Sequence, residues 1–146
     1  MIEKDASEVF LQLTTDRTYR GLRINDYYGL YIVGGSGDDV PVRSAGAEQI
    51  VALSLIAALN RNAVKKGPVI MDTPFGRLDV KHRANILSFL STMADQVVLL
   101  VHSGEVDRER DLAVVAPHVQ REYELRFVSS TNTVITPLVG TGAQDA

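Results

Sequence analysis

The feature that most constrains the fold is a short apolar run that ends on an acid. Residues 68–79 read Pro-Val-Ile-Met-Asp-Thr-Pro-Phe-Gly-Arg-Leu-Asp, and Pro74 and Gly76 interrupt the run just after Asp72. The pattern predicts a buried strand that delivers Asp72 at its carboxyl end. Ligands of α/β proteins bind beyond the carboxyl ends of strands, where an acid can hold a metal–phosphate group. Turn chemistry alone also places Asp after strands, so other signals have to support a site.

A second apolar run, residues 97–101, ends on His102. Between the two runs, residues 81–93 have the amphipathic spacing of a helix. A strand, a helix and a strand in this order predict a βαβ unit with parallel strands. The predicted fold class is therefore α/β, a mainly parallel sheet with flanking helices, with Asp72 and His102 at the same edge. A lone histidine after a strand is also a common loop residue, and that alternative stays open.

A long apolar helix is predicted to begin after Ser44, which suits an N-cap. Its residues to about Asn60 are apolar almost all the way round, so we expect burial on most sides. A helix amino end carries unpaired N–H groups that suit a phosphate. Taken alone, the residues around Ser44 favour a simple helix cap over a phosphate site.

The remaining patterns predict an amino-terminal helix, two pairs of strands, one further helix and a tail. Residues 1–15 have helical spacing with Val9, Phe10 and Leu13 on one face. The other expected elements are strands 19–24 and 27–33 joined at Asn25-Asp26, a helix over 106–116, an outer strand over 122–128, a strand over 133–138 and a small polar tail.

Several classes of protein are excluded or disfavoured by composition. The chain has no cysteine, which excludes disulfides and thiolate metal sites and fits a cytoplasmic protein. No apolar run approaches the ~20 residues of a membrane span, so no membrane partner is expected. The net charge of −3 gives no bulk attraction to nucleic acid. The glycines from Gly34 to Gly37 are interpreted as a loop, because a phosphate-binding P-loop needs a Gly-Lys pair and the chain has none.

These segments, taken in order, resemble the carboxyl-terminal half of an ABC-type ATPase head, and more narrowly the SMC-like DNA-maintenance ATPases. The resemblance rests on Ser44-Ala45-Gly46, the strand ending at Asp72, then Asp79 and His102, and it covers roughly residues 8–138. The string over residues 71–79, followed by His82-Arg83, is most similar to the DndD type. That type is associated with DNA phosphorothioation and restriction.

The resemblance implies a division of the chain and a set of partners. Residues 1–15 are the end of a returning coiled-coil helix and 16–138 the carboxyl-terminal lobe of the head. Residues 139–146 are expected to be a disordered tail because they are small and polar. The missing P-loop lies in an amino-terminal lobe of the same full-length protein. ATP and Mg²⁺ bind between two heads of a homodimer, DNA is contacted indirectly, and other DNA-modification subunits are further partners.

In the resembled family, Ser44-Ala45-Gly46 correspond to the signature motif, which touches the γ-phosphate held by the second head. Asp79 corresponds to the D-loop acid, which communicates across the head dimer. The signature usually begins Leu-Ser and carries Glu or Gln where Ala47 stands, and Arg43 occupies the place of the Leu.

Asp72 corresponds to the Walker B aspartate, which supports Mg²⁺ through water, and His102 to the switch histidine, which senses the γ-phosphate. Thr73 stands where many ABC ATPases have the Glu that polarises the attacking water. A Thr hydroxyl is no base near neutral pH, and a general base contributes roughly 10²–10⁴ in rate. Hydrolysis is therefore predicted to be slow unless Glu105 or another group substitutes, and we interpret Glu105 as a surface residue.

Three functions remain open from the sequence. The chain is an ATPase subunit that hydrolyses ATP once joined to its P-loop lobe, an ATP-gated dimerisation clamp with negligible hydrolysis, or a stand-alone α/β binding module. The isolated chain is predicted to be inactive and to bind ATP weakly, because the P-loop supplies most phosphate contacts. We also expect an exposed apolar surface where the missing lobe would pack.

Overall fold

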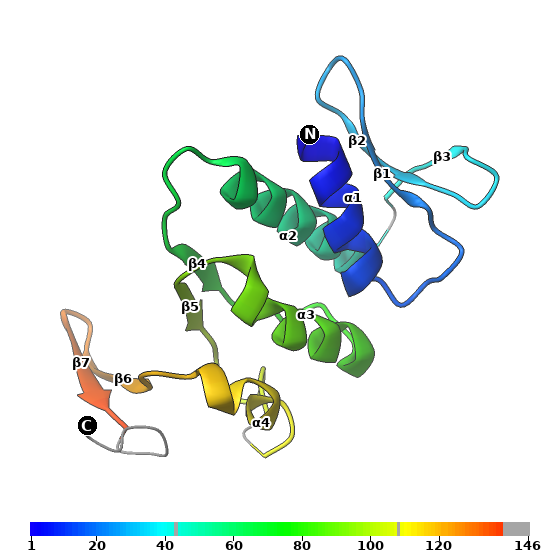
Figure 1. Ribbon diagram of the computed structural model, residues 1–146. Helices are drawn as coiled ribbons and strands as arrows, with labels where there is room; N and C mark the ends of the chain where they lie inside the picture. Colours follow the sequence, from blue (N-terminus) through cyan, green and yellow to red (C-terminus); the bar gives the residue numbers. More distant parts are fainter. Residues whose placement is uncertain (43, 108, 139–146) are drawn as a thin grey trace.

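The computed structural model describes residues 1–42, 44–107 and 109–138. The predicted tail and Arg43, one of the departures from the signature, lie outside these ranges. The elements, shown in Figure 1, are α1 (Ile2–Leu13), β1 (Gly21–Ile24), β2 (Leu30–Val33), β3 (Asp39–Val40), α2 (Ala45–Asn62), β4 (Val69–Asp72), α3 (Val80–Met93), β5 (Val97–Leu100), α4 (Leu112–Val115), the 3₁₀ turn η1 (Ala116–His118), β6 (Tyr123–Ser129) and β7 (Asn132–Pro137).

The strands form three small sheets. β4 and β5 pair in parallel around α3, which confirms the βαβ unit. β1, β2 and β3 form an antiparallel sheet, and β6 and β7 form an antiparallel hairpin. The prediction of a mainly parallel sheet is therefore wrong for the described residues. Strands joined by short turns pair antiparallel, and the outer strands of this chain are all joined in that way.

The core lies between three helices and the strands they cover. α1 packs along α2, with α3 beside them (Figure 1). The buried side chains of α1 recur at helical spacing and confirm the predicted face: Ala6, Val9, Phe10 and Leu13. Each large apolar side chain buried in this way contributes about 1.5–3 kcal/mol to stability. Within the described ranges, no helix combines the length and the apolar character that crossing a bilayer requires.

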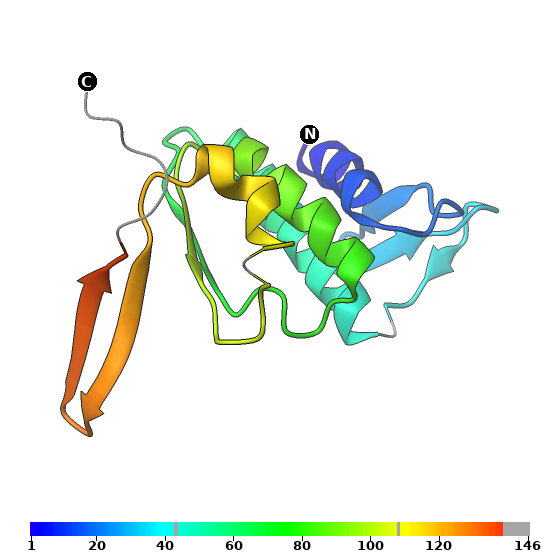
Figure 2. The same ribbon diagram turned by 90° about the horizontal axis from the view of Figure 1, so that it is seen from below.

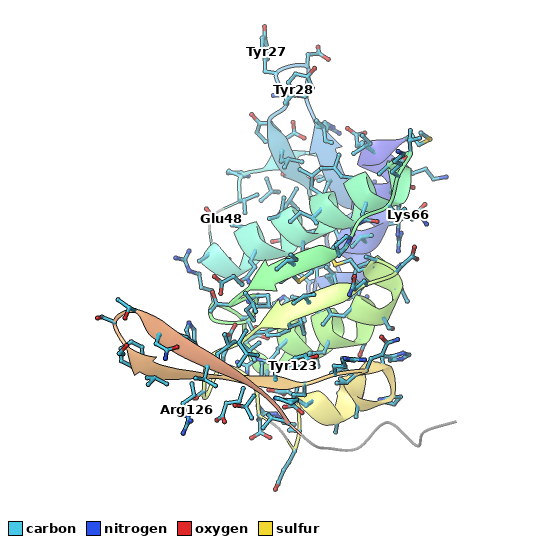
Figure 3. All side chains as sticks on the ribbon, turned by 90° about the vertical axis from the view of Figure 1, so that its left-hand side faces the viewer. Tyr27, Tyr28, Glu48, Lys66, Tyr123 and Arg126 are labelled. Carbon is cyan, nitrogen blue, oxygen red and sulfur yellow. The ribbon has the colours of Figure 1, made fainter. Side chains whose placement is uncertain are left out.

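The turn between β1 and β2 is wider than the predicted Asn25-Asp26 pair. The backbone N–H of Asn25 donates to the carbonyl of Gly29 over 3.0 Å, so both ends of the loop are tied. The Asn25 side-chain oxygen accepts from the N–H groups of Tyr27 and Gly29. Tyr27 and Tyr28 project from the tip into solvent (Figure 3). The strand predicted over residues 27–33 therefore begins only at Leu30, because the loop closed by Asn25 extends to Gly29.

The helix predicted over residues 106–116 is shorter than expected, because α4 begins only at Leu112. Two aspartates explain the difference. The Asp107 carboxylate accepts from the N–H of Arg110, and the Asp111 carboxylate accepts from the N–H of Asp107. Such local side-chain bonds compete with helix formation. Pro117 lies in the 3₁₀ turn η1, which follows α4 directly.

One face of the β4–β5 pair is uncovered. Val69 and Met71 are buried against the helices, whereas Ile70 on the alternate face is 66% exposed. Figure 3 looks onto this face, with α2 and α3 behind the strands. We call it the open face, and its members are Ile70, Asp72, Val98 and Leu100. Parallel strands are normally covered on both sides, so a bare parallel pair is an unusual arrangement.

The open face continues onto α2. Ile56 and Leu59 of this helix are 43% and 47% exposed, so the prediction of burial on most sides is wrong for this part of α2. Together with Pro68 and Ile70 they line a shallow cavity of about 440 Å³. The expected exposed apolar surface is therefore present, and it extends over one helix and two strands.

The β6–β7 hairpin projects away from the rest of the molecule (Figure 2). Every residue of both strands is exposed. Leu125 pairs with Ile135 in the register, and these side chains share one face with Tyr123 and Phe127. The hairpin therefore carries an uncovered apolar face of its own.

Candidate functional site

Asp72 and His102 lie at the same edge of the molecule. Asp72 is the last residue of β4 and pairs with Leu100, the last residue of β5. The N–H of Thr73 extends the pairing by donating to the Leu100 carbonyl over 2.8 Å. His102 follows two residues later, and the side chains of both Asp72 and His102 are exposed.

Thr73 directs the chain away from the strand. Its φ is +48°, in the left-handed region that a β-branched residue rarely adopts. A left-handed residue other than glycine costs roughly 1–2 kcal/mol. The turn sends Phe75 into the core, where this side chain is fully buried. The strain thus lies directly beside Asp72 and is compensated by the anchoring of Phe75.

Glu105 joins the loops that follow the two strands. One carboxylate oxygen accepts from the N–H of Phe75 over 2.7 Å, and the other accepts from the N–H of His102 over 3.1 Å. Glu105 is half-buried. Its interpretation as a surface residue is therefore wrong. The signal was present in the sequence, since Gly104 permits the tight turn, at φ +87°, that folds the Glu105 side chain back.

The start of α2 packs against the loop over residues 73–79, which we call the β4–α3 loop. Ser44 is the predicted N-cap, and its hydroxyl accepts from the N–H of Ala47 over 3.1 Å. A Cβ on Gly46 would lie 3.2 Å from the Arg77 carbonyl oxygen, so glycine allows this close approach. The side-chain amide of Gln49 donates to the carbonyl of Pro74.

Asp79 connects the β4–α3 loop to the end of α1. It caps α3 by accepting from the N–H of His82 over 2.9 Å, which lowers the pKa of the Asp79 carboxyl. Its second oxygen lies 2.8 Å from Nδ1 of His82, and Nε2 of that ring lies 3.0 Å from the Thr15 hydroxyl. His82 was singled out only through the resemblance; the Asp-x-x-His spacing at a helix start could have indicated this contact.

The signature segment and Asp79 share one cavity of about 500 Å³. It is lined by Ser44 to Ala47, Arg77 to Asp79, His82 and the end of α1. Asp72, Thr73 and His102 do not line it and lie at the strand ends instead. The β4–α3 loop joins the two groups. The start of α2 and the loops after β4 and β5 accordingly lie along one border of the molecule, the lower edge in Figure 2.

The described residues do not provide a complete set of protein ligands for a metal ion. Among residues 1–42, 44–107 and 109–138 there is no group of three or more acidic or histidine side chains that could hold a metal. Mg²⁺ keeps several waters and is typically held by one or two carboxylates together with substrate phosphates. The single exposed carboxylate of Asp72 fits that kind of ion and does not fit an ion bound by protein alone.

A buried ion network supports the loop after β5 from behind. Asp111 is 5% exposed and accepts from Arg110 Nε over 2.9 Å and from Arg83 Nη1 over 3.1 Å. Arg110, with a further bond from the Asp107 N–H and the contribution of Arg83, holds the pKa of Asp111 well below its usual range. The network fastens the segment before α4 to α3.

No protein-family model matches the chain, and no protein of curated function matches it. Solved structures do match. A structure from work on ATP-driven dimerisation and DNA-stimulated activation of SMC ATPases shares 15% identity with the chain, at a TM-score of 0.65, over 94% of this chain and 83% of that one. The SMC head domain from Thermotoga maritima shares 15% at 0.62, over 94% and 47%.

An Smc head bound to the C-terminal winged-helix domain of ScpA gives 16% identity and a TM-score of 0.64, over 94% of this chain and 42% of that one. The chain thus spans less than half the length of two of these three structures. Sequence identities of this size support a similarity of fold only. They do not test the assignment to the DndD type, which stays a prediction. Over most of its length, the chain has the fold of part of an SMC ATPase head domain.

Proposed function

We propose that the chain is the carboxyl-terminal lobe of an SMC-like ATPase head and supplies half of an ATP site shared between two heads. The observation that supports this most is the shared border: the Ser44-capped helix start, the end of β4 and the loop after β5 are joined by the β4–α3 loop. The fold likeness to SMC heads, one of them described by its ATP-driven dimerisation, supports the same function.

Within this proposal, the residues at the strand ends act on the nucleotide of their own head. Asp72 would hold Mg²⁺ through water, and the ion would neutralise charge on the ATP phosphates. His102 contacts the γ-phosphate. Phosphoryl transfer needs mainly positioning and charge stabilisation, so these two side chains have to be held accurately relative to each other.

The signature segment acts on the nucleotide of the second head. Ser44, Ala45 and Gly46 present a hydroxyl and the N–H groups of a helix start to that γ-phosphate. Asp79 carries the state of this contact across the dimer. Its link through His82 to Thr15 connects it with the end of α1, and we propose that residues 1–15 are the end of a returning coiled-coil helix.

The partner that completes the head is a P-loop lobe. The open face of β4 and β5, the exposed side of α2 and the apolar face of the hairpin are the surfaces it would cover. A parallel pair needs cover on both faces, and the helices supply only one. Residues 16–138 form the lobe that receives it. The biological role we propose is DNA modification, restriction or repair of the DndD type, with DNA contacted indirectly and other modification subunits as partners.

A second function, an ATP-gated clamp with negligible hydrolysis, is favoured by one observation. Thr73 lies where the water-polarising carboxylate is usual, and its strained backbone holds it there. In a clamp, ATP closes the head dimer and the closed state itself is the output. A stand-alone binding module would instead bind ATP tightly without any P-loop lobe.

The test uses the chain assembled with its P-loop lobe. Steady-state ATP turnover is measured for the wild type, for Asp72→Ala and for Asp95→Ala, an exposed aspartate at the opposite end of the strand pair. Turnover lost only in Asp72→Ala supports the ATPase. ATP-dependent dimerisation without turnover supports the clamp, and micromolar ATP affinity of the chain alone, measured by calorimetry, refutes both.

A further inference from the structure

We infer that Glu105 is a positioning residue that sets the Asp72 end of β4 against His102. The inference rests on the proposed ATPase function and deepens it. Glu105 is the one residue in the described part of the chain whose side chain bonds both loops, through the N–H of Phe75 and the N–H of His102.

The positions of the two bonded amides explain why this contact matters. Phe75 is fully buried, so its backbone is a fixed point in the β4–α3 loop. The short segment from Asp72 to Phe75 runs through the strained turn at Thr73. His102 lies in the loop after β5, two residues beyond Leu100, the last paired residue. The carboxylate of Glu105 therefore fixes the distance between two loops where strand pairing no longer does.

The same geometry distinguishes positioning from proton transfer. Each carboxylate oxygen of Glu105 already accepts a hydrogen bond from a backbone N–H group, so the side chain is held between the two loops. A general base needs an oxygen within hydrogen-bond reach of the attacking water. Glu105 instead keeps Asp72 and His102 in register, and displacement of a reacting group by about 1 Å can cost roughly 10²-fold in rate.

Glu105 is itself supported from behind. The turn over residues 102–105 is closed by the Glu105 N–H, which donates to the His102 carbonyl over 3.1 Å. Two residues further on, the N–H of Asp107 donates to the buried Asp111, which pairs with Arg83 of α3. A positioning side chain has to be rigid, and this one is anchored through the chain to a helix of the core.

The first experiment tests the contact directly on the 146-residue chain. Amide NMR spectra are compared for the wild type, Glu105→Gln and the control Glu109→Gln, an exposed glutamate nearby. Glu105→Gln is expected to shift the amide resonances of both Phe75 and His102, although Phe75 is distant in sequence. Glu109→Gln is expected to shift neither. An unmoved Phe75 resonance in Glu105→Gln overturns the inference.

The second experiment tests the role in the assembled head. Glu105→Ala should lower kcat by roughly 10–100-fold with KM for ATP within about threefold of the wild type, since misalignment affects the reacting groups and not nucleotide binding. Glu105→Gln retains one acceptor oxygen and should recover part of that loss. A Glu105→Gln variant as inactive as Glu105→Ala, with the acid limb of the pH–rate profile abolished, would assign general-base chemistry instead and overturn positioning.

The two failures are distinguishable. If the wild-type head shows no turnover while both amides shift in Glu105→Gln, the ATPase proposal fails, and Glu105 only stabilises the contact between the two loops. If the head turns over ATP and Glu105→Ala has wild-type kcat, the ATPase stands and the inference about Glu105 falls.

Discussion

Because β4 has one open and one buried face, the same substitution at two adjacent residues should change the free energy of unfolding by very different amounts. Ile70 is 66% exposed and Met71 is 6% exposed. A lysine at position 70 would stay in water, so Ile70→Lys should change the free energy of unfolding by no more than about 0.5 kcal/mol. A lysine at position 71 would bring an ammonium among the side chains of the helices, and Met71→Lys should cost several kcal/mol, roughly 3–5.

Association with the P-loop lobe, in contrast, should be weakened by Ile70→Lys, because Ile70 lies on the face that we propose the lobe covers. Fully burying an isoleucine contributes about 1.5–3 kcal/mol. Two thirds of Ile70 remain accessible, so a covering lobe would gain roughly 1–2 kcal/mol from this side chain alone. Ile70→Lys forfeits that gain and adds the desolvation of a charge. Since 1.4 kcal/mol is a factor of ten in Kd, association with the P-loop lobe should weaken by at least about tenfold.

Urea unfolding followed by circular dichroism measures the first effect, and sedimentation with the P-loop lobe measures the second. Equal destabilisation by Ile70→Lys and Met71→Lys would show that the face is packed within the chain itself. Wild-type association of Ile70→Lys would show that the lobe docks elsewhere. Either result refutes the reasoning from the exposed fractions.

Three further outcomes follow from the contacts described above. Asp111→Ala leaves Arg83 half-buried without its acid and should cost about 3 kcal/mol in urea unfolding. Because the pKa of Asp111 is lower in the folded than in the unfolded chain, its stabilisation is present above about pH 3.8 and is lost as the pH falls below that value. A wild-type free energy of unfolding that rises on acidification would contradict this. Ser44→Ala removes the α2 cap and should cost about 1 kcal/mol, with Ser44→Asp as the capping control. Thr73→Gly should leave the thermal midpoint unchanged or raised, since glycine adopts φ +48° without strain; a loss above about 1 kcal/mol would mean that the Thr73 side chain stabilises the turn.

The elements with strong local signals were predicted from the sequence. The helical spacing of Val9, Phe10 and Leu13 predicts α1, and an apolar run ended by Asp72 predicts β4. Ser44 caps α2 as expected, because a serine hydroxyl directly before a helix can accept from one of the unpaired N–H groups of its first turn. In each case the residues that determine the element lie within the element or directly beside it in the sequence.

The features that were missed depend on groups distant in sequence or on competing local bonds. Apolar residues such as Ile70 and Leu59 give the same pattern whether a neighbouring layer covers them or not. The helix before Pro117 is short because the side chains of Asp107 and Asp111 bond the backbone, which spacing does not reveal. Glu105 contacts Phe75 across thirty positions of sequence, so its polarity alone indicated a surface residue.

The central claim is that the signature segment serves the nucleotide of another head, whereas Asp72 serves its own. The most direct measurement compares ATP affinity and ATP-dependent dimerisation in one variant of the assembled head, Ser44→Arg, with Ser44→Ala as the control for cap loss. We predict that Ser44→Arg binds ATP with wild-type affinity as a monomer and fails to dimerise when ATP and Mg²⁺ are added. Monomeric Ser44→Arg heads that lose ATP affinity, or that still dimerise like the wild type, would contradict the account.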